Sequence, residues 1–171
     1  MIIDLSEIIK NDSIKINLDS DISFEQVEFM GESFQFEKPL HIKGTIVNNT
    51  KSLELNAEVE GEMGVCCARC REPLTVRVEF GVKEVIMQNA EGIDDEDVIV
   101  IDGEKIDIAE VVLNNFLMNV SGKYLCHDDC KGLCPKCGIN LNKGECNCSD
   151  DDIDPRWAKL AEIMKDSSDT K

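Results

Sequence analysis

Nine cysteines, most of them in closely spaced pairs, are the residues of this chain best suited to chemistry. Thiolates bind zinc, and four of them complete a tetrahedral structural site. Eight of the nine form four pairs, which are Cys67 with Cys70, Cys126 with Cys130, Cys134 with Cys137, and Cys146 with Cys148. Eight thiolates are enough for two such sites. The sequence therefore predicts two structural Zn²⁺ ions.

The last two pairs predict a compact zinc ribbon. Cys134 and Cys137 lie in a short turn, and Gly138 relaxes the backbone directly after the second ligand. Cys146 and Cys148 follow after a short intervening segment. Because a C-x2-C turn can direct two sulfurs at one point, these four cysteines predict one metal site.

The other two pairs predict a site that joins distant parts of the sequence. Cys126 and Cys130 need two more ligands, and Cys67 with Cys70 are the pair still available. Such a site would attach a turn in the middle of the sequence to the cysteine-rich stretch. Other arrangements stay open, since four pairs combine in three ways and His127 could replace one thiol.

Cys66 is the ninth cysteine, and we expect a free thiol there, although it could compete with Cys67 for the metal. A free and activated thiol would suit a redox sensor or a thiol enzyme, which is the alternative function. A non-catalytic function is favoured, because four protein thiolates leave no open position for a reacting water. The sequence also has no Gly-rich phosphate loop and no G-x-S-x-G motif.

The overall charge argues against non-specific binding of nucleic acid. There are 35 acidic and 18 basic residues, for a net charge of -17. Neutralising phosphates needs an excess of Lys and Arg, so a basic protein surface is the more natural partner. Five basic residues lie among the cysteines and could form a local patch that contacts RNA or that only offsets thiolate charge: Arg69, Arg71, Lys131, Lys136 and Lys143.

No segment of the sequence predicts a membrane protein or a secreted one. The first residues, MIIDLSEII, contain acids and have no basic region of the kind that opens a signal peptide. No apolar run approaches the roughly 20 residues that a membrane span needs. We therefore expect a cytoplasmic protein, in which thiols stay reduced and paired cysteines bind metal rather than form disulfides.

Alternating apolar residues predict the strands that position the upstream cysteine pair. Strands are expected at 14–18, 40–46, 53–59, 74–80 with an extension to about 87, and 98–101. Cys67 and Cys70 then lie at the tip of a hairpin. The segment before residue 14 fits either a strand or a short helix. We expect an antiparallel sheet that could close into a small barrel.

Two helices complete the predicted α+β fold. Asp107 has the form of an N-cap for a helix over about 108–119, where apolar residues recur at helical spacing. Asp154 could cap a short C-terminal helix that docks on the body or the ribbon. The expected domains are a β body with one helix at 1–122, a cysteine-rich, zinc-ribbon-like module at 123–149, and a C-terminal helix with a frayed tail at 150–171.

The order of these motifs resembles the YceD family of bacterial and plastid proteins. The shared features are the mid-sequence C-x2-C hairpin, the stretch CHDDCKGLCPKCGINLNKGECNC and the segment DPRWAKL, and the resemblance covers roughly residues 30 to 165. It implies a role in 23S rRNA accumulation or processing during large-subunit biogenesis, with a partner from that machinery and no enzymatic activity. Some members keep the upstream pair but lack the ribbon, which supports the grouping of the cysteines given above.

Overall fold

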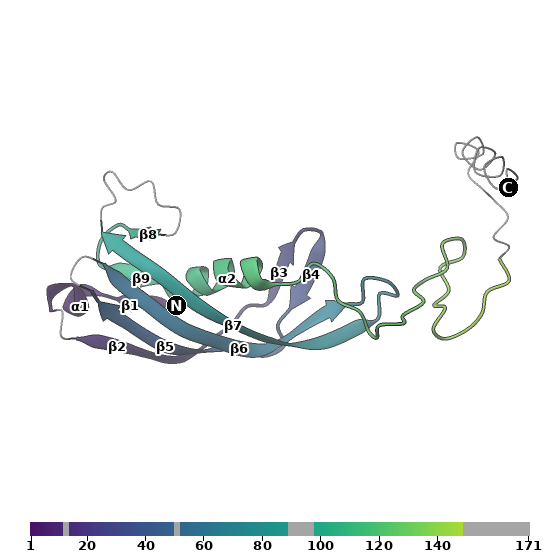
Figure 1. Cartoon of the computed structure of the whole chain (residues 1–171), viewed down its shortest axis with the longest axis horizontal. Helices are drawn as coiled ribbons and strands as arrows, with labels where there is room; N and C mark the ends of the chain where they lie inside the picture. The colour runs from purple at the N-terminus through teal and green to yellow at the C-terminus, as the bar shows by residue number, and fades with distance from the viewer. Residues whose placement is uncertain (12–13, 50–51, 89–97, 149–171) are drawn as a thin grey trace, which may run out of the picture.

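The computed structural model of the protein describes residues 1–11, 14–49, 52–88 and 98–148. These residues form a mainly antiparallel sheet, two helices and a long irregular segment after the second helix (Figure 1). The elements are β1 (Ile2–Asp4), α1 (Ser6–Lys10), β2 (Lys15–Ile22), β3 (Gln26–Phe29), β4 (Glu32–Gln35), β5 (Leu40–Asn48), β6 (Leu53–Cys66), β7 (Pro73–Gln88), β8 (Val98–Ile101), β9 (Lys105–Asp107) and α2 (Ile108–Asn119).

The sheet is organised around the long antiparallel hairpin of β6 and β7. The two strands pair from Leu53 opposite Ile86 to Cys66 opposite Pro73. On the other edge of β6, β5 pairs with the first half of the strand and β2 pairs with β5. The small β3–β4 hairpin meets the same edge of β6 nearer to the tip. The far half of the hairpin therefore extends beyond β5 and carries its tip away from the main sheet.

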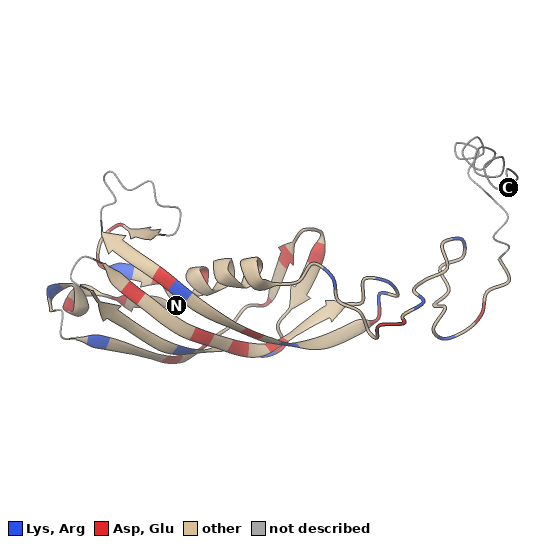
Figure 2. Ribbon diagram, viewed as in Figure 1, with Lys and Arg blue, Asp and Glu red and all other residues tan. Residues whose placement is uncertain are grey.

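Alternation of apolar and charged residues explains the two faces of this sheet. The predicted inward residues of β6 are buried, and Leu55 and Val59 have no exposed surface. In β7, Val78 and Phe80 are buried, whereas Leu74 and Val76 nearer to the tip are half-buried. Many of their sequence neighbours are charged and lie on the outer face, where Figure 2 shows acidic residues along the strands. The strands predicted at 40–46, 53–59 and 74–80 are thus confirmed.

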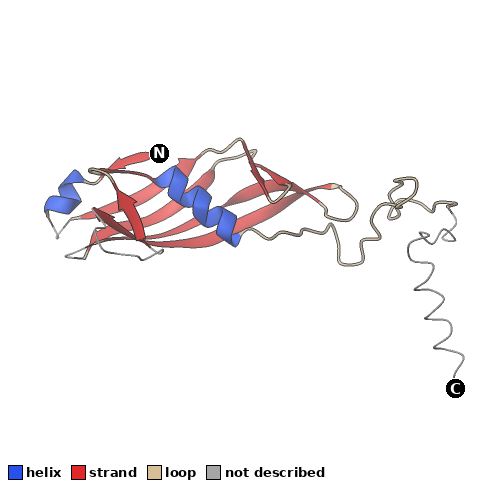
Figure 3. Cartoon of the chain, turned by 90° about the horizontal axis from the view of Figure 1, so that it is seen from above, coloured by secondary structure: helices blue, strands red, loops and turns tan. Residues whose placement is uncertain are grey.

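The sheet is open, so the expected small barrel is wrong. Among the described strands, β2 and β8 lie at opposite edges and do not pair with each other. The physical reason is that α2 lies across one face of the sheet and covers its apolar side chains (Figure 3). Phe116 of α2 is 2% exposed and meets the rings of Phe34, Phe36 and Phe80 at centroid distances of 5.3 to 6.3 Å.

Helix α2 is found where the sequence predicts it. The Asp107 side chain accepts a hydrogen bond from the backbone N–H of Ala109 at 3.0 Å, as an N-cap does. The other helix that the structure describes is α1. It lies in the segment before residue 14, for which the sequence fits either a strand or a short helix. The helix expected after Asp154 lies outside the described residues. The domain limits at residues 122 and 149 stay predictions.

Several strand pairings are absent from the sequence-based description, among them those of β3, β8 and β1. The β3–β4 hairpin turns at Met30 and Gly31, which have φ values of 52° and 81°. Positive φ at both positions is the requirement of a two-residue hairpin turn with the twist of the strands. β8 pairs with β7 in parallel rather than antiparallel, and β1 pairs with β9 in a separate two-stranded ladder.

Two cysteine clusters as candidate metal centres

The first cluster lies at the tip of the β6–β7 hairpin. Its members are Cys67, Cys70, Cys126 and Cys130, whose sulfurs all lie within 4.8 Å of one another. Cys67 and Cys70 come from the turn between the two strands, and the other two come from the segment after α2. The sulfur–sulfur distance is 3.8 Å between Cys67 and Cys130 and 3.6 Å between Cys70 and Cys126.

Backbone hydrogen bonds hold the hairpin tip in the shape that directs its two sulfurs. The N–H of Cys67 donates to the carbonyl of Glu72 at 2.8 Å, and the N–H of Arg71 donates to the carbonyl of Cys67 at 2.9 Å. The N–H of Ala68 donates to the carbonyl of Tyr124 at 2.8 Å, which draws the segment after α2 against the tip. This last contact brings the downstream pair of cysteines to the upstream pair.

The second cluster is built locally. Its members are Cys134, Cys137, Cys146 and Cys148, again with all sulfurs within 4.8 Å. The N–H of Gly138 donates to the carbonyl of Cys134 at 2.9 Å, and the N–H of Cys134 donates to the carbonyl of Ile139 at 2.9 Å. Gly138 has φ of 74°, so the glycine after the second cysteine fulfils the role that the sequence suggests. These bonds form a short closed turn around the first pair.

The structure thus brings all eight predicted cysteines together, in the two groups that their spacing suggested. Cys66 belongs to neither group. It ends β6, and strand alternation turns it away from Val65 and Cys67, which are both buried. His127 is exposed and also lies outside the groups of four, although its Nδ1 is 3.1 Å from the sulfur of Cys126.

Hydrogen-bond donors favour ionisation of only some thiols in the first cluster. Burial raises the pKa of Cys67, but the N–H groups of Cys70, Arg69 and Cys126 that point at its sulfur outweigh burial and lower its pKa to about 6. Burial, together with the neighbouring sulfurs, raises the pKa of Cys126 to about 12. Burial opposes ionisation of Cys130 too, but hydrogen bonds from the Asn142 side chain and the N–H of Gly132 lower its pKa. The cluster therefore favours ionisation of some of its thiols and resists ionisation of the others.

In the second cluster too, the pKa of one thiol is lowered and that of another is raised. Hydrogen bonds from the N–H groups of Cys137 and Lys136 lower the pKa of Cys134 to about 6. The hydrogen bond with Cys137, together with burial, raises the pKa of Cys148 to about 12. Four thiols this close cannot all ionise unless a positive charge lies between them. A divalent cation would supply that charge in either cluster.

The distances also suit a metal. A tetrahedron of thiolates about 2.3 Å from a central ion has edges of about 3.8 Å. The closest sulfur pairs are 3.6 and 3.8 Å apart in the first cluster, and Cys134 and Cys146 are 3.5 Å apart in the second. All nine cysteines are free thiols. Both clusters could therefore hold a metal ion that prefers sulfur ligands.

Asn142 is a residue of this region that sequence reasoning missed. It lies in the segment between the two pairs of the second cluster, and its Nδ2 donates to the sulfur of Cys130 in the first cluster at 3.3 Å. Its Oδ1 accepts a hydrogen bond from the N–H of Lys131 at 2.8 Å. Spacing alone gives no signal for such a contact, because an asparagine beside cysteines usually makes a turn.

The basic residues near the clusters are largely engaged within the protein. Arg69 Nη1 donates to the carbonyls of Cys130 at 2.8 Å and Asp128 at 3.2 Å. Arg71 lies 3.4 Å from Glu32, and Lys143 lies 3.0 Å from Glu72, each as an ion pair. Lys131 and Lys136 line a groove of about 370 Å³ beside the second cluster. At least three of the five predicted basic residues therefore bind the protein itself.

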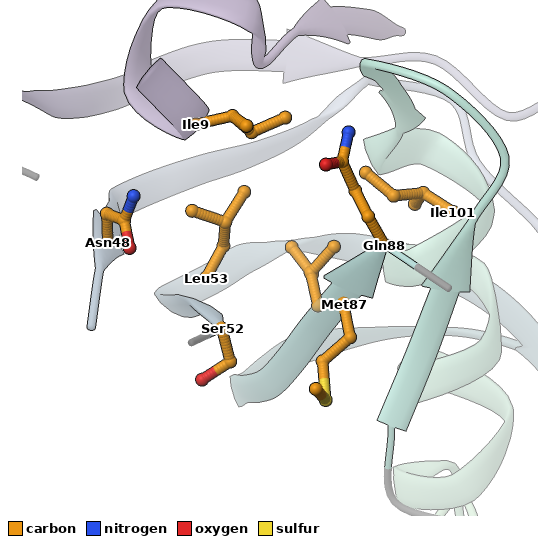
Figure 4. A pocket seen from close by; sticks show the side chains of 8 residues that line it. Ile9, Asn48, Ser52, Leu53, Met87, Gln88 and Ile101 are labelled. Atoms are coloured by element: carbon orange, nitrogen blue, oxygen red, sulfur yellow. The ribbon is translucent and has the colours of Figure 1, made fainter. Parts of the chain in front are cut away.

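A hollow of about 200 Å³ lies at the opposite end of the β6–β7 hairpin (Figure 4). Its lining residues are Ile9, Asn48, Ser52, Leu53, Ile86, Met87, Gln88 and Ile101. The side-chain amides of Asn48 and Gln88 in this lining already donate hydrogen bonds within the protein. Asn48 donates to the carbonyl of Ile8 at 2.8 Å, and Gln88 donates to the carbonyl of Gly103 at 2.6 Å. Among the described residues, the lining offers no acid, base or thiol.

Comparison with known proteins finds a family model that matches much of the chain. A family model described as "Large ribosomal RNA subunit accumulation protein YceD" matches residues 55–164. An uncharacterized protein of Mycobacterium tuberculosis is 36% identical over 109 residues, which are 61% of this chain and 52% of that protein. The chain thus spans about half the length of this relative.

Two further relatives extend the comparison. The uncharacterized protein YlbN of Bacillus subtilis is 22% identical over 154 residues, which are 89% of this chain and 90% of that protein. An Arabidopsis thaliana protein described as "Large ribosomal RNA subunit accumulation protein YCED homolog 1, chloroplastic" is 31% identical over 62 residues, which are 36% of this chain and 19% of that protein. No solved structure matches the sequence. Neither helix of the described residues has the length and apolar character of a membrane span.

Proposed function

Because this chain belongs to the YceD family, we propose that it is a non-catalytic, zinc-binding factor that promotes the accumulation of 23S rRNA in large-subunit biogenesis. The observation that carries the proposal is the convergence of eight thiols into two groups of four, all within the segment that matches the family. The Arabidopsis relative is named for the accumulation of the large ribosomal RNA subunit.

The metal that we propose for both clusters is Zn²⁺. Four thiolates in tetrahedral array are the usual set for structural zinc, and they leave no position for a reacting water. A bound Zn²⁺ would supply positive charge and four fixed sulfur bonds. Cys67, Cys70, Cys126 and Cys130 would hold one ion, and Cys134, Cys137, Cys146 and Cys148 would hold the other.

In this proposal the protein acts by presenting a rigid surface. The first cluster joins the hairpin tip to the segment after α2, and the second folds the ribbon. Contacts of the protein reinforce this joint, since Arg69 donates to the carbonyl of Cys130 and Lys143 pairs with Glu72. The tip, the segment and the ribbon then move as one unit, which is the property that a binding surface needs.

The partner that we propose is a protein of the ribosome-assembly or rRNA-processing machinery. The net charge of -17 favours a basic partner, and the acidic residues of β6 and β7 lie on the exposed face of the sheet (Figure 2). Arg69, Arg71 and Lys143 are engaged within the protein. A direct contact with rRNA through the ribbon is the competing outcome, and the partner experiment below separates the two.

Complementation tests the function. In a bacterium that lacks this gene, mature 23S rRNA should fall relative to 16S rRNA, and the wild-type gene should restore it. Cys130→Ser should fail to restore it, because it removes a buried member of the first cluster. Cys66→Ser is the matched control, since Cys66 belongs to neither cluster. Normal 23S rRNA without the gene would refute the role, and failure of Cys66→Ser would favour a thiol redox sensor or enzyme.

A pull-down of the zinc-loaded protein, with and without nuclease, identifies the class of partner. A protein that stays bound after nuclease treatment would support the acidic surface as the working face. Recovery of 23S precursor that disappears with its proteins after nuclease treatment would instead indicate RNA contact. In that case Lys131→Glu and Lys136→Glu in the groove should weaken recovery more than Lys43→Glu on the sheet.

A further inference from the structure

The segment between the two cysteine pairs of the second cluster reaches back to the first cluster. Asn142 is its contact residue, and its side chain is fixed on several sides. Nδ2 donates to the sulfur of Cys130 at 3.3 Å and to Oδ1 of Asn140 at 3.0 Å. Oδ1 accepts from the N–H of Lys131 at 2.8 Å. The ribbon thus holds a hydrogen-bond donor against a thiol that belongs to the other cluster.

We propose that Asn142 is a positioning residue that couples the two metal sites, so that a metal in the second cluster increases the retention of the metal in the first. This inference rests on the proposed metal binding, and it adds a dependence of one site on the other. The coupling is reciprocal in equilibrium affinity: whatever factor the second metal adds to the first site, the first metal adds to the second.

We expect metal binding in the second cluster to order the segment around Asn142. Residues 138–145 contain no helix or strand. Their backbone is anchored at a few points, among them the bonds of Cys134 with Ile139 and of Leu141 with Gly132. Such a short irregular segment loses considerable entropy when it is ordered, and metal bonds at both of its ends would offset that loss. Without the second metal, Asn142 would keep its hydrogen bonds with Lys131 and Asn140, but its segment would lose the metal bonds at both ends, and its contact with Cys130 would weaken.

The hydrogen bond itself explains why its loss should matter. A thiolate in the first cluster carries charge that an N–H donor stabilises, and charge-assisted hydrogen bonds are stronger than neutral ones. Groups that hydrogen-bond to metal ligands orient those ligands, and removing them typically weakens metal binding by about 10–100-fold. Asn142 has the position of such a group toward Cys130, and it comes from the ribbon rather than from the sheet.

The second cluster is also the one that would release its metal first. Its Cys137 is exposed and two of its other members are half-buried, whereas three members of the first cluster are buried. A chelator therefore reaches the second site more easily. Loss of this metal would free residues 138–145 and, through Asn142, loosen the first site. Release of the two metals should consequently be ordered.

The test follows both metals in the full-length protein. The protein is loaded with ¹¹³Cd²⁺ to give one NMR resonance for each site, and with Zn²⁺ to measure release to a chromogenic chelator. Asn142→Asp is the informative variant, because it keeps the oxygen that accepts from Lys131 but replaces the donor at Cys130. Glu145→Gln is the matched control, since Glu145 is an exposed residue of the same segment whose side chain forms no hydrogen bond or ion pair with any described residue. Cys137→Ser empties the second site and assigns the resonances.

Support would consist of three results. Asn142→Asp keeps two metals, shifts the first-site ¹¹³Cd resonance and accelerates first-site zinc release by about 10-fold or more. Cys137→Ser accelerates first-site release to a similar degree, and Glu145→Gln changes it less than about 2-fold. Equal first-site release in the wild type, Asn142→Asp and Cys137→Ser would overturn the coupling alone. A purified protein that binds no metal would overturn the proposed zinc function and the coupling with it.

Discussion

The two cysteine clusters use the same four-thiol chemistry but are built in opposite ways. In the first, contacting sulfurs belong to residues 56 and 63 positions apart in the sequence, and three of the four thiols are buried. In the second, Cys134 and Cys146 are 12 positions apart, and Cys137 is exposed. One cluster joins distant parts of the fold, while the other shapes a short loop.

This difference in construction should give the clusters different energetic roles. A cross-link stabilises a fold chiefly by restricting the unfolded state, and the effect grows with the length of the loop it closes. A metal in the first cluster closes a loop of about sixty residues that includes β7 and α2. A metal in the second cluster closes only the ribbon. The first should therefore stabilise the body, and the second should act locally.

The largest effect should come from Cys130→Ser. This change should remove one metal and lower the free energy of unfolding by about 3–4 kcal/mol, as expected for losing a cross-link around a loop of this length. Metal content by mass spectrometry and denaturant unfolding measure the two quantities. Cys66→Ser should keep both metals and change stability by less than about 1 kcal/mol. Equal unfolding curves for the two variants would erase the distinction between the clusters.

Cys137→Ser should have a smaller and more local effect. It should also remove one metal, but the free energy of unfolding of the body should fall by only about 1–2 kcal/mol, mostly through the weakened first site. Hydrogen exchange should show lost protection in residues 132–148 and preserved protection in β5, β6 and β7. Loss of protection throughout the sheet would mean that the ribbon stabilises the whole body. In that case both clusters would stabilise the same part of the fold.

Gly132→Ala should weaken the joint between the clusters. Gly132 has φ of 76°, and a Cβ there would lie 3.1 Å from the carbonyl oxygen of Arg69. The left-handed backbone alone should cost about 1–2 kcal/mol, measured by chemical denaturation with both metals still bound. Gly144→Ala is the control, because a Cβ there meets no atom within 4 Å. Similar losses in both variants would show that the ribbon tolerates no side chain at either glycine.

The smallest effect should come from His41, which lies on the sheet away from both clusters. Its hydrogen bond with Asp21 at 2.9 Å raises the pKa of the imidazole, with further help from Asp19. The stabilisation is therefore complete below the unfolded pKa of about 6.5 and is lost as the pH rises through the raised folded pKa. His41→Gln should lower the unfolding midpoint more at about pH 6 than at about pH 9, with metal content unchanged. A pH-independent difference would contradict the ion-pair explanation.

Local pattern was enough to predict the parts that carry the first pair of cysteines. Alternation gives the β6–β7 hairpin and places Cys67 and Cys70 at its tip, and helical spacing behind Asp107 gives α2. Spacing also suggested the grouping of the cysteines, because the second group is local and leaves two pairs for the first.

Long-range partners were not predictable in the same way. Alternation reveals a strand but not its neighbour, so the parallel pairing of β8 and the ladder of β1 with β9 were missed. The open sheet depends on Phe116 reaching three rings from other elements, which no local pattern encodes. Asn142 was missed for the same reason, since its partner Cys130 belongs to another cluster.

The long separation within the first cluster has a consequence for the nascent polypeptide. Synthesis at about 5–20 residues per second leaves an interval of roughly 3–11 s between the making of Cys70 and that of Cys126, 56 positions later. During this time the hairpin tip carries two thiols without their partners, open to oxidants and stray metals. The second cluster needs no such wait. In the nascent polypeptide, Cys67 and Cys70 must therefore stay reduced until the ribosome has made Cys130.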